Sequence, residues 1–369
     1  MKIIHIVRQF YPCIGGVENY IYNLSKTQLA AGNDVTVLTL NKNLCTKEDL
    51  SDNEIIEGIK IKRIPFTGSK RYPIALSSVT NLDGCDIVNI HCVDSFIDYL
   101  GILKPFHKKR IILSTHGGYF HTKWLKILKQ VYFYTVTRII LYSCDKIIAN
   151  SNSDHILFKK ISNNVVRVDN GVEVEAFSSV SKNIEFGYLL YIGRLDSHKR
   201  IDNLVRTIPF LLKKNINVKL GIIGPDWNDT RKGLEHIAKG LGIKNSINFM
   251  GSLSRDNLLN ELSKAHLFVS ASEYEGFGIS AIEAMASGTP CVLNDIASFR
   301  DFIATSKAGA LVNFNDHEQA ARAISNIICM DKINYDLMAL NAKKKAKEYS
   351  WETVGKAVMK VYEDVLYQK

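Results

Sequence analysis

The stretch that decides the fold runs from His266 to Leu293 and reads HLFVSASEYEGFGISAIEAMASGTPCVL. It holds a short apolar run at 266–270, a loop punctuated by glycines, a helical pattern at 278–286 and a second apolar run at 290–293. Two short apolar runs joined by a helix favour parallel strands, because parallel neighbours need a long crossover connection. The stretch therefore predicts one β-α-β unit of a parallel sheet.

The same alternation extends in both directions along the chain. It predicts two doubly wound α/β domains in tandem, covering residues 1–172 and 173–354. We place the linker at 173–187, where periodicity is weak, and expect the C-terminal helix 355–369 to pack back on the first domain. The predicted strands are Lys2–Arg8, Asp34–Leu40, Ile59–Pro65, Ile87–His91, Arg110–Thr115, Lys146–Asn150, Val165–Val168, Tyr188–Gly193, Lys219–Ile223, Ile247–Met250, His266–Ser270, Pro290–Leu293 and Gly309–Val312.

Composition excludes several classes of protein. The 369 residues are 46% hydrophobic, which excludes intrinsic disorder, and no apolar run approaches the ~20 residues of a membrane-spanning helix. Seven cysteines are scattered without a Cys-x-x-Cys motif, so we expect neither disulfides nor a zinc site. A reducing cytoplasm is the natural compartment for such a chain.

The net charge of +10 is concentrated in one segment. Residues 99–144 contain no Asp or Glu, and the chain from Lys123 reads KWLKILKQVYFYTVTRIILY. Lys123, Lys126 and Lys129 recur every three residues with Trp124 among them, a pattern typical of helices that lie on anionic bilayers. An ordinary core-facing helix with a solvated lysine face is the alternative interpretation. We find no nucleic-acid recognition motif and expect no nucleic-acid partner.

Two motifs offer groups for an anion. Gly15 and Gly16 follow the first strand and open a helix, so the backbone can approach a ligand at a helix N-terminus; a tight turn without a ligand is the alternative. Arg194 and Lys199 lie on one strand-to-helix loop and could clamp a diphosphate, or could be solvated surface cations.

Two further motifs offer groups for hydroxyls. His116 follows a strand beside two glycines and could reach a ligand from a rigid support, although a structural histidine is the alternative. Glu275 and Glu283 lie eight residues apart around the helix that opens at Gly278. Two carboxylates at this spacing can accept hydrogen bonds from sugar and ribose hydroxyls.

Together these motifs resemble the retaining family 4 glycosyltransferases. The resemblance rests on Glu275 and Glu283, on Gly-Phe-Gly between them, and on the Gly-Gly-Val-Glu, Asn-Gly-Val and Gly-Arg-Leu motifs at 15–18, 170–172 and 193–195. It covers nearly the whole chain. It implies the GT-B fold, in which two Rossmann-like domains face each other across a cleft.

The N-terminal half is similar to one subgroup of that family. Its segments VRQF at 7–10, SKRYPIA at 69–75 and STHGGYFHT at 114–122 look like those of the α-mannosyltransferases of xanthan-type exopolysaccharide assembly. This resemblance implies transfer of mannose from GDP-mannose to a polyprenyl-diphosphate-linked oligosaccharide by an enzyme peripherally associated with the inner face of the plasma membrane. Segment 99–144, with Lys123, Trp124, Lys126 and Lys129, would serve the anionic membrane surface and the acceptor.

The resemblance also implies residue roles. The catalytic group would be His116 on the transferred sugar, Arg194 and Lys199 on the diphosphate, and Glu275 on the sugar 3- and 4-hydroxyls. Substrate would be held by backbone N–H groups of Gly15 and Gly16, by those around Phe277 and Gly278, and by Glu283 on the ribose.

The family implies no metal or other cofactor, and the chain has no Asp-x-Asp motif. Three alternatives stay open: a UDP-sugar donor on the same fold, a GT-B nucleotide-sugar 2-epimerase, and a catalytically silent sugar-nucleotide binding protein.

Overall fold

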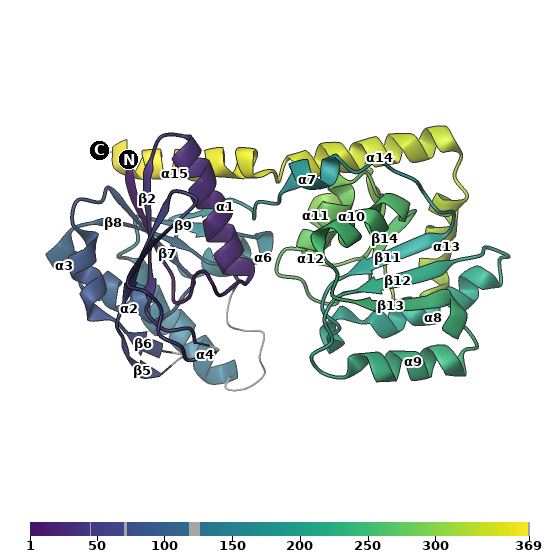
Figure 1. The fold of residues 1–369 in the computed structure, drawn as a ribbon, viewed down its shortest axis with the longest axis horizontal. Helices are drawn as coiled ribbons and strands as arrows, with labels where there is room; N and C mark the ends of the chain where they lie inside the picture. The colour runs from purple at the N-terminus through teal and green to yellow at the C-terminus, as the bar shows by residue number, and fades with distance from the viewer. Residues whose placement is uncertain (45, 70–71, 118–125, 368–369) are drawn as a thin grey trace. The chain divides into compact units, whose positions relative to one another are not determined.

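The computed structural model describes residues 1–369 except 45, 70–71, 118–125 and 368–369. The chain forms two compact units (Figure 1). The N-terminal unit comprises Met1–Gly171 and Trp351–Lys369, and the C-terminal unit comprises Val172–Ser350.

The N-terminal unit is built on a sheet with the strand order β10-β9-β8-β7-β1-β2-β4-β3. Neighbouring strands are parallel except β3 and β4, which form an antiparallel pair at one edge. A separate antiparallel hairpin joins β5 and β6. The strands are β1 (Lys2–Ile6), β2 (Asp34–Leu40), β3 (Asn53–Ile56), β4 (Ile59–Ile64), β5 (Thr67–Ser69), β6 (Tyr72–Ile74), β7 (Ile87–His91), β8 (Arg110–Ser114), β9 (Lys146–Ala149) and β10 (Val165–Arg167).

Helices cover both faces of this sheet. Because successive residues of a strand point to opposite faces, a single strand contributes side chains to both cores. Ile4 and Ile6 of β1 belong to the core beneath α2, α5 and α6, whereas Ile3 belongs to the core beneath α1 and α15. The helical elements are α1 (Gly16–Ala30), the 3-10 helix η1 (Leu76–Leu82), α2 (Ser95–Ile102), α3 (Lys104–His107), α4 (Lys126–Tyr132), the π-helical turn η3 (Phe133–Thr137), α5 (Arg138–Leu141), α6 (Asn152–Phe158) and α15 (Trp351–Tyr367).

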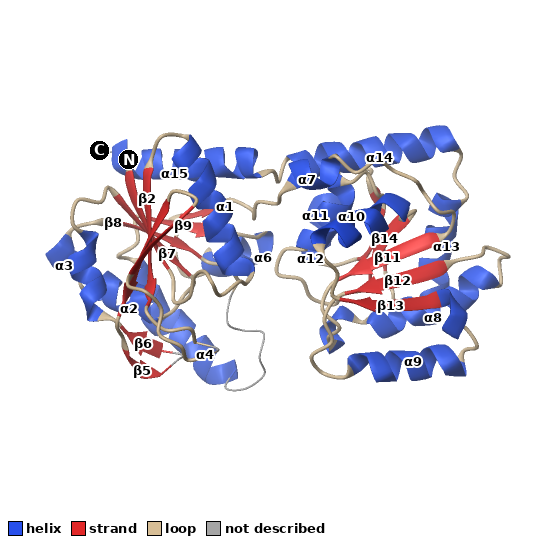
Figure 2. Cartoon of the chain, viewed as in Figure 1, coloured by secondary structure: helices blue, strands red, loops and turns tan. Residues whose placement is uncertain are grey.

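The C-terminal unit is a parallel sheet with the order β13-β12-β11-β14-β15-β16. Figure 2 shows α10 and α11 on one side of the sheet and α8 and α9 on the other. The strands are β11 (Tyr188–Ile192), β12 (Lys219–Ile223), β13 (Ile247–Gly251), β14 (Leu267–Ser270), β15 (Cys291–Asn294) and β16 (Gly309–Val312). The helices are α7 (Val174–Ser178), η4 (Ser197–Lys199), α8 (Ile201–Leu212), α9 (Thr230–Gly240), η5 (Lys244–Ser246), α10 (Arg255–Lys264), α11 (Ile279–Ala286), α12 (Ala297–Ile303), α13 (His317–Ile328) and α14 (Lys332–Lys347).

Each unit is thus doubly wound, and the predicted fold class of two Rossmann-like halves is confirmed. The predicted strands all occur, with ends that differ by at most two residues. Three strands were not predicted: β3, β5 and β6. These are short, and β3 and β5 carry mostly exposed residues, so the period-2 burial that marks a strand in sequence is weak there.

The prediction that residues 173–187 form the linker between the domains is wrong. The chain passes between the units at 171–172, and α7 already belongs to the C-terminal unit, with Val174 and Phe177 buried in its core. Weak periodicity misled the prediction because a helix of five residues is too short to show one. The chain returns to the N-terminal unit at Trp351, four residues before the expected start of the returning helix.

Two of the four residues predicted to contact the membrane surface and the acceptor, Lys123 and Trp124, lie outside the described residues. Lys126 begins α4, and Lys129 lies in its last turn. Among the described residues, no helix is both long and apolar enough to cross a membrane.

The C-terminal helix is fastened to the N-terminal sheet by a buried hydrogen bond. Asn89 Nδ2 of β7 donates to Tyr362 Oη of α15 over 2.6 Å, and both side chains are fully buried. Asn89 Oδ1 in turn accepts from Ser114 Oγ at 3.1 Å. This polar link holds α15 in one register along the sheet.

We predict that Tyr362→Phe lowers the free energy of unfolding by about 1–3 kcal/mol, because the buried amide of Asn89 loses its acceptor. Calorimetric unfolding of the full chain measures the effect. The matched control is Tyr367→Phe, since Tyr367 lies on the same helix and is 77% exposed. Equal transitions for the two variants would contradict the prediction.

Candidate functional site

The predicted sugar- and phosphate-binding residues follow the carboxyl ends of parallel strands in both units. In the C-terminal unit the loops after β11 and β14 carry Arg194, Lys199 and Glu275. In the N-terminal unit Gly15 and Gly16 follow β1, and His116 follows β8. Open parallel sheets bind ligands at this edge.

Lys199 and Glu275 are brought together from loops 76 residues apart. Lys199 Nζ donates to Glu275 Oε1 at 2.7 Å, with both side chains more than four-fifths buried. Ser272 Oγ donates to the same oxygen at 2.8 Å, and Ser298 Oγ donates to the carbonyl oxygen of Glu275. The carboxylate therefore holds a fixed position, and within the described residues both of these side-chain donors bond to Oε1 and neither bonds to Oε2.

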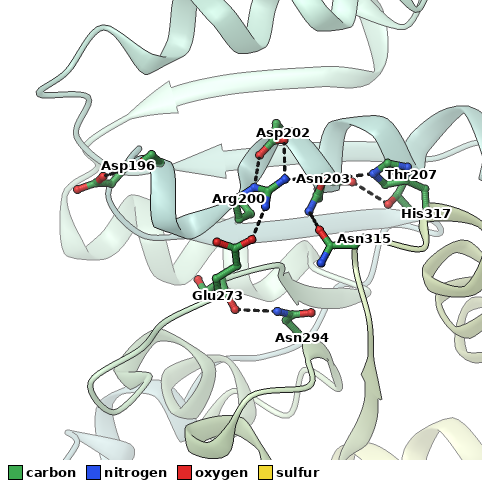
Figure 3. A network of polar contacts seen from close by, with 11 residues as sticks. Asp196, Arg200, Asp202, Asn203, Thr207, Glu273, Asn294, Asn315 and His317 are labelled. Carbon is green, nitrogen blue, oxygen red and sulfur yellow. Dashed lines mark hydrogen bonds and ion pairs between the residues drawn. The ribbon is translucent and has the colours of Figure 1, made fainter. Parts of the chain in front are cut away.

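A polar network fixes the two loops to each other (Figure 3). The guanidinium of Arg200 lies between the carboxylates of Asp202 and Glu273, and contacts both. Arg200 also donates to Asn203 Oδ1, which extends the network to α8. Glu273 N donates to the carbonyl oxygen of His198 at 2.9 Å, which ties the backbones of the two loops.

The network continues to β15 and to the loop that follows β16. Asn294 Nδ2 donates to the carbonyl oxygen of Ser272, and Asn294 Oδ1 accepts from Phe314 N. Asn203 Nδ2 donates to Asn315 Oδ1 at 3.1 Å (Figure 3). The loops that carry Lys199 and Glu275 are therefore held by side chains where regular secondary structure has ended.

Arg194 points to a different partner. Its guanidinium packs over the indole of Trp227 at 5.1 Å from the ring centroid, and Trp227 is 71% exposed. A planar cation held on an aromatic face keeps its N–H edge available to an anion. Next to it, a pocket of about 250 Å³ lies at the ends of β11, β12 and β13, with Leu195, Pro225, Asp226, Phe249 and Ser252 in its wall.

The helix that carries Glu283 begins at a glycine, which leaves the backbone N–H groups there accessible. Gly278 is its N-cap with φ +105°, and a Cβ there would lie 2.9 Å from the ring of Phe299. Only glycine fits that conformation and that space. Phe277 contributes its backbone alone, because its ring is buried between Phe302 and Tyr349.

Glu283 lies within α11 and is half-buried. Burial raises its pKa to about 7; Arg255 opposes that shift and Glu173 adds to it. Arg255 is itself paired with Glu173 at 2.5 Å, so its charge is largely compensated. Glu283 is therefore a carboxyl group near its midpoint of titration at neutral pH.

In the N-terminal unit the start of α1 already attracts a carboxylate. Gly15 is the N-cap, and the Glu18 carboxylate folds back so closely that a Cβ on Gly15 would lie 2.4 Å from its Oε2. Burial raises the pKa of Glu18, and Arg8 opposes that shift. The helix N-terminus thus holds an anionic group near Gly15 and Gly16, as the helix dipole favours.

His116 is held in a strained conformation. Its φ is +50°, a value that non-glycine residues rarely adopt and that clusters at functional sites. Its N–H donates to Asn150 Oδ1 at 3.3 Å, and the N–H of Gly117 donates to Asp154 Oδ2 at 2.8 Å. Its Nε2 lies 2.8 Å from Nδ1 of His91.

Sequence reasoning missed several supporting residues. Ser272, Ser298 and Asn294 are small polar residues whose contacts depend on the tertiary structure, so no pattern marks them. Trp227 could have been noticed as an aromatic in a loop after a strand. Among the described residues, no group of three or more His, Cys, Asp and Glu side chains could hold a metal ion.

The chain matches two family models. The model described as Glycosyltransferase Family 4 matches residues 14–176, and the model described as Glycosyl transferases group 1 matches residues 175–348. The boundary between the matches falls close to the division between the units.

Relatives match along nearly the whole chain. A GDP-mannose:cellobiosyl-diphosphopolyprenol alpha-mannosyltransferase from Komagataeibacter xylinus is 31% identical over 99% of this chain and 94% of its own length. The protein of the same name from Xanthomonas campestris is 31% identical over 96% of this chain and 94% of its own length.

Solved structures share the fold at lower identity. A sucrose-phosphate synthase from Thermosynechococcus elongatus matches with a TM-score of 0.78 at 19% identity over all of both chains. A glycosyltransferase from Rickettsia africae matches with a TM-score of 0.75 at 18% identity over 100% of this chain and 99% of its own. The family-model matches and the 31% identical relatives show that the chain belongs to the family 4 glycosyltransferases of the GT-B fold.

Proposed function

We propose that this enzyme transfers mannose from GDP-mannose to a polyprenyl-diphosphate-linked oligosaccharide with retention of configuration, in the assembly of a bacterial exopolysaccharide or a related surface glycan. The support is the likeness to mannosyltransferases whose names state that donor and acceptor, over nearly full length. The observation in the structure that carries the proposal is the buried Lys199–Glu275 pair at the carboxyl ends of β11 and β14. It offers a cation to a diphosphate and a carboxylate to sugar hydroxyls.

In this proposal the C-terminal unit binds the donor. Arg194 and Lys199 stabilise the charge that grows on the diphosphate as the glycosidic bond breaks. N–H groups around Phe277 and Gly278 hold phosphate oxygens at the start of α11. Glu275 accepts from sugar hydroxyls, and Glu283 accepts from the ribose. The acceptor hydroxyl attacks from the leaving-group face, and a phosphate oxygen takes its proton.

Lys199 is paired with Glu275, so donor binding would exchange the partners of both side chains. Phosphate oxygens take over part of the Lys199 contact, while the sugar hydroxyls occupy the carboxylate of Glu275. In the N-terminal unit, an anion bound at Gly15 and Gly16 would likewise replace the Glu18 carboxylate. Lys199 and the start of α1 are therefore each positioned next to an internal carboxylate that the donor would displace.

No metal is assigned a step in this mechanism. In this proposal the cations of Arg194 and Lys199 and the N–H groups around Phe277 and Gly278 neutralise the diphosphate directly. We propose that the nucleoside base lies near the pocket that Asp226 and Phe249 line. A UDP-sugar donor or a 2-epimerase remains the alternative that experiment decides.

The first experiment measures transfer from GDP-mannose, with UDP-glucose in parallel, to a cellobiosyl-diphospholipid acceptor. We expect mannosyl product from GDP-mannose only, and a loss of about 100- to 1,000-fold in kcat for Lys199→Ala, because one fixed charge at the leaving group is removed. Lys213→Ala, an exposed lysine at the end of α8, is the matched control.

Three outcomes would overturn parts of this proposal. If product forms from UDP-glucose and not from GDP-mannose, then GDP-mannose is not the donor. Conversion of the nucleotide sugar without any acceptor would favour the epimerase. If Lys199→Ala turns over at the wild-type rate and its thermal unfolding is unchanged, then Lys199 does not stabilise the diphosphate.

The raised pKa of Glu283 gives the proposed ribose contact a pH dependence. The ionised carboxylate is the stronger acceptor, and it is lost as pH falls through about 7. We therefore expect the affinity for GDP-mannose to fall by about tenfold between pH 8 and pH 6. Calorimetric titration measures this, and GDP-mannose suits it because its phosphodiester groups do not titrate in that range.

Glu283→Gln is the control for all other titrating groups. It cannot ionise, so its affinity should be weaker than wild type at pH 8 and nearly constant down to pH 6. The same slope in Glu283→Gln and in wild type would mean that another group is responsible and that Glu283 does not hold the ribose.

We further propose that the N-terminal unit docks on an anionic membrane surface, at the inner face of the plasma membrane. Apolar side chains stand exposed along residues 126–142 and at the adjoining α2 and α3, where Gly101 packs against Ile140. Among them, Phe106 is 80% and Ile127 78% exposed. We call this set the apolar surface: Ile102, Phe106, Ile127, Leu128, Val131, Tyr134, Ile139 and Tyr142.

This exposure argues against a core-facing helix whose lysines alone face water. Ile127 and Leu128 are exposed, whereas Lys129 is half-buried. Charge favours an anionic lipid surface as the occupant, because segment 99–144 contains no Asp or Glu and the carboxylates on either side of it have partners within the protein. Asp98 is buried and accepts from Tyr72 and Tyr132, and Asp145 is paired with Lys104 and Arg110.

We predict that Phe106→Ser with Ile127→Ser weakens binding to phosphatidylglycerol vesicles by about 10- to 100-fold, since two apolar side chains no longer enter the bilayer. Vesicle sedimentation measures binding, and Lys129→Glu should weaken it further on anionic vesicles only. The matched control is Ile333→Ser on α14, where the side chain is 82% exposed outside this surface. Unchanged binding by the double variant would refute the docking surface.

A further inference from the structure

A chain of four side chains in the N-terminal unit ends at His116. Gln28 Oε1 of α1 lies 2.7 Å from Nε2 of His5 on β1. His5 Nδ1 lies 2.9 Å from Nε2 of His91 at the end of β7, and His91 Nδ1 lies 2.8 Å from Nε2 of His116. Three imidazoles thus connect the middle of the sheet to the loop after β8.

These imidazoles are neutral. Gln28, His5 and His91 are completely buried. Burial lowers the pKa of His5 to about 4 and that of His116 to about 3, and it lowers the pKa of His91 as well. A neutral imidazole carries one N–H and one lone pair, so each ring in the chain donates on one side and accepts on the other.

The Gln28 oxygen therefore sets the direction of every donor. It can only accept, so His5 donates from Nε2 and keeps a lone pair on Nδ1. His91 must then donate from Nε2 to His5, and His116 must donate from Nε2 to His91. The remaining nitrogen, Nδ1 of His116, carries a lone pair.

The ring of His116 is also fixed in space. Tyr20 meets it edge-on at 4.6 Å between centroids, and His91 stacks beside it at 5.1 Å. Its backbone is held at φ +50° by the loop contacts described above. Within the described part of the chain, no hydrogen-bond partner is recorded for Nδ1 of His116.

We propose that Gln28 is a positioning residue that acts through His5 and His91 to hold His116 in one tautomer, with Nδ1 as a hydrogen-bond acceptor for a hydroxyl of the transferred sugar. This rests on the proposed function, in which His116 contacts that sugar. An acceptor at this point selects sugars that present a hydroxyl there. It disfavours hexuronic acid donors, because a carboxylate can accept but cannot donate.

The test is the protonation state of the ring nitrogens of His116, read by two-bond ¹H–¹⁵N correlation spectra of the full chain labelled in histidine. We expect Nδ1 without a proton and Nε2 with one in the wild-type protein. In Gln28→Met, which keeps length but has no carbonyl, we expect Nδ1 to become partly protonated. Ser25→Ala is the matched control, since Ser25 is equally buried on the same helix and belongs to no part of the chain of rings.

Turnover with GDP-mannose provides a second readout through a double-mutant cycle. Gln28→Met should lower kcat by about tenfold in the wild-type background and have no further effect in His116→Ala, since both act through one contact. A protonated Nδ1 in the wild-type spectrum would overturn the proposal without any variant, and so would ring nitrogens that do not respond to Gln28→Met. His116→Ala could keep wild-type turnover while Gln28→Met still changes the protonation of Nδ1 in the spectra. In that case His116 does not contact the sugar, but Gln28 does set the tautomer of His116.

Discussion

Parallel strand pairing is the constraint on which the candidate site depends. When neighbouring strands run in the same direction, all their carboxyl ends lie at one edge of the sheet, and the loops that follow them emerge together. In the C-terminal unit, β11 and β14 are paired, so the loops with Lys199 and Glu275 meet although they are far apart in sequence. In the N-terminal unit, β7 lies between β1 and β8, which brings His5, His91 and His116 into one line.

Loops at such an edge lack the regular hydrogen bonds of the sheet, so side chains must hold them. Arg200, Glu273 and Asn294 do so in the C-terminal unit, where charged and amide groups link the two loops to β15 (Figure 3). Rigid support is what electrostatic catalysis needs, because a charge stabilises a transition state only if it is already in place. The buried pair of Lys199 and Glu275 has that support.

Much of the fold and part of the site could be predicted from residues near each other in the chain. Apolar runs of four to seven residues marked the strands, and Gly278 marked the start of α11. Other features left no such trace. His5 and His91 look like ordinary strand residues, and Gln28 looks like a helix residue, since their relation depends on which strands are neighbours. The short helix α7 was missed because its burial is decided by packing and not by periodicity.

The sequence by itself determined the two doubly wound halves, the strand-end position of the motifs and the family to which the chain belongs. It did so because strand and helix periodicity, glycine at strand ends and the spacing of two glutamates are local properties. Only the tertiary structure decided that Lys199 pairs with Glu275, that Arg194 packs on Trp227 and that three histidines share hydrogen bonds. Such contacts join side chains across different strands and loops, and their energies depend on burial, which no single segment of sequence fixes.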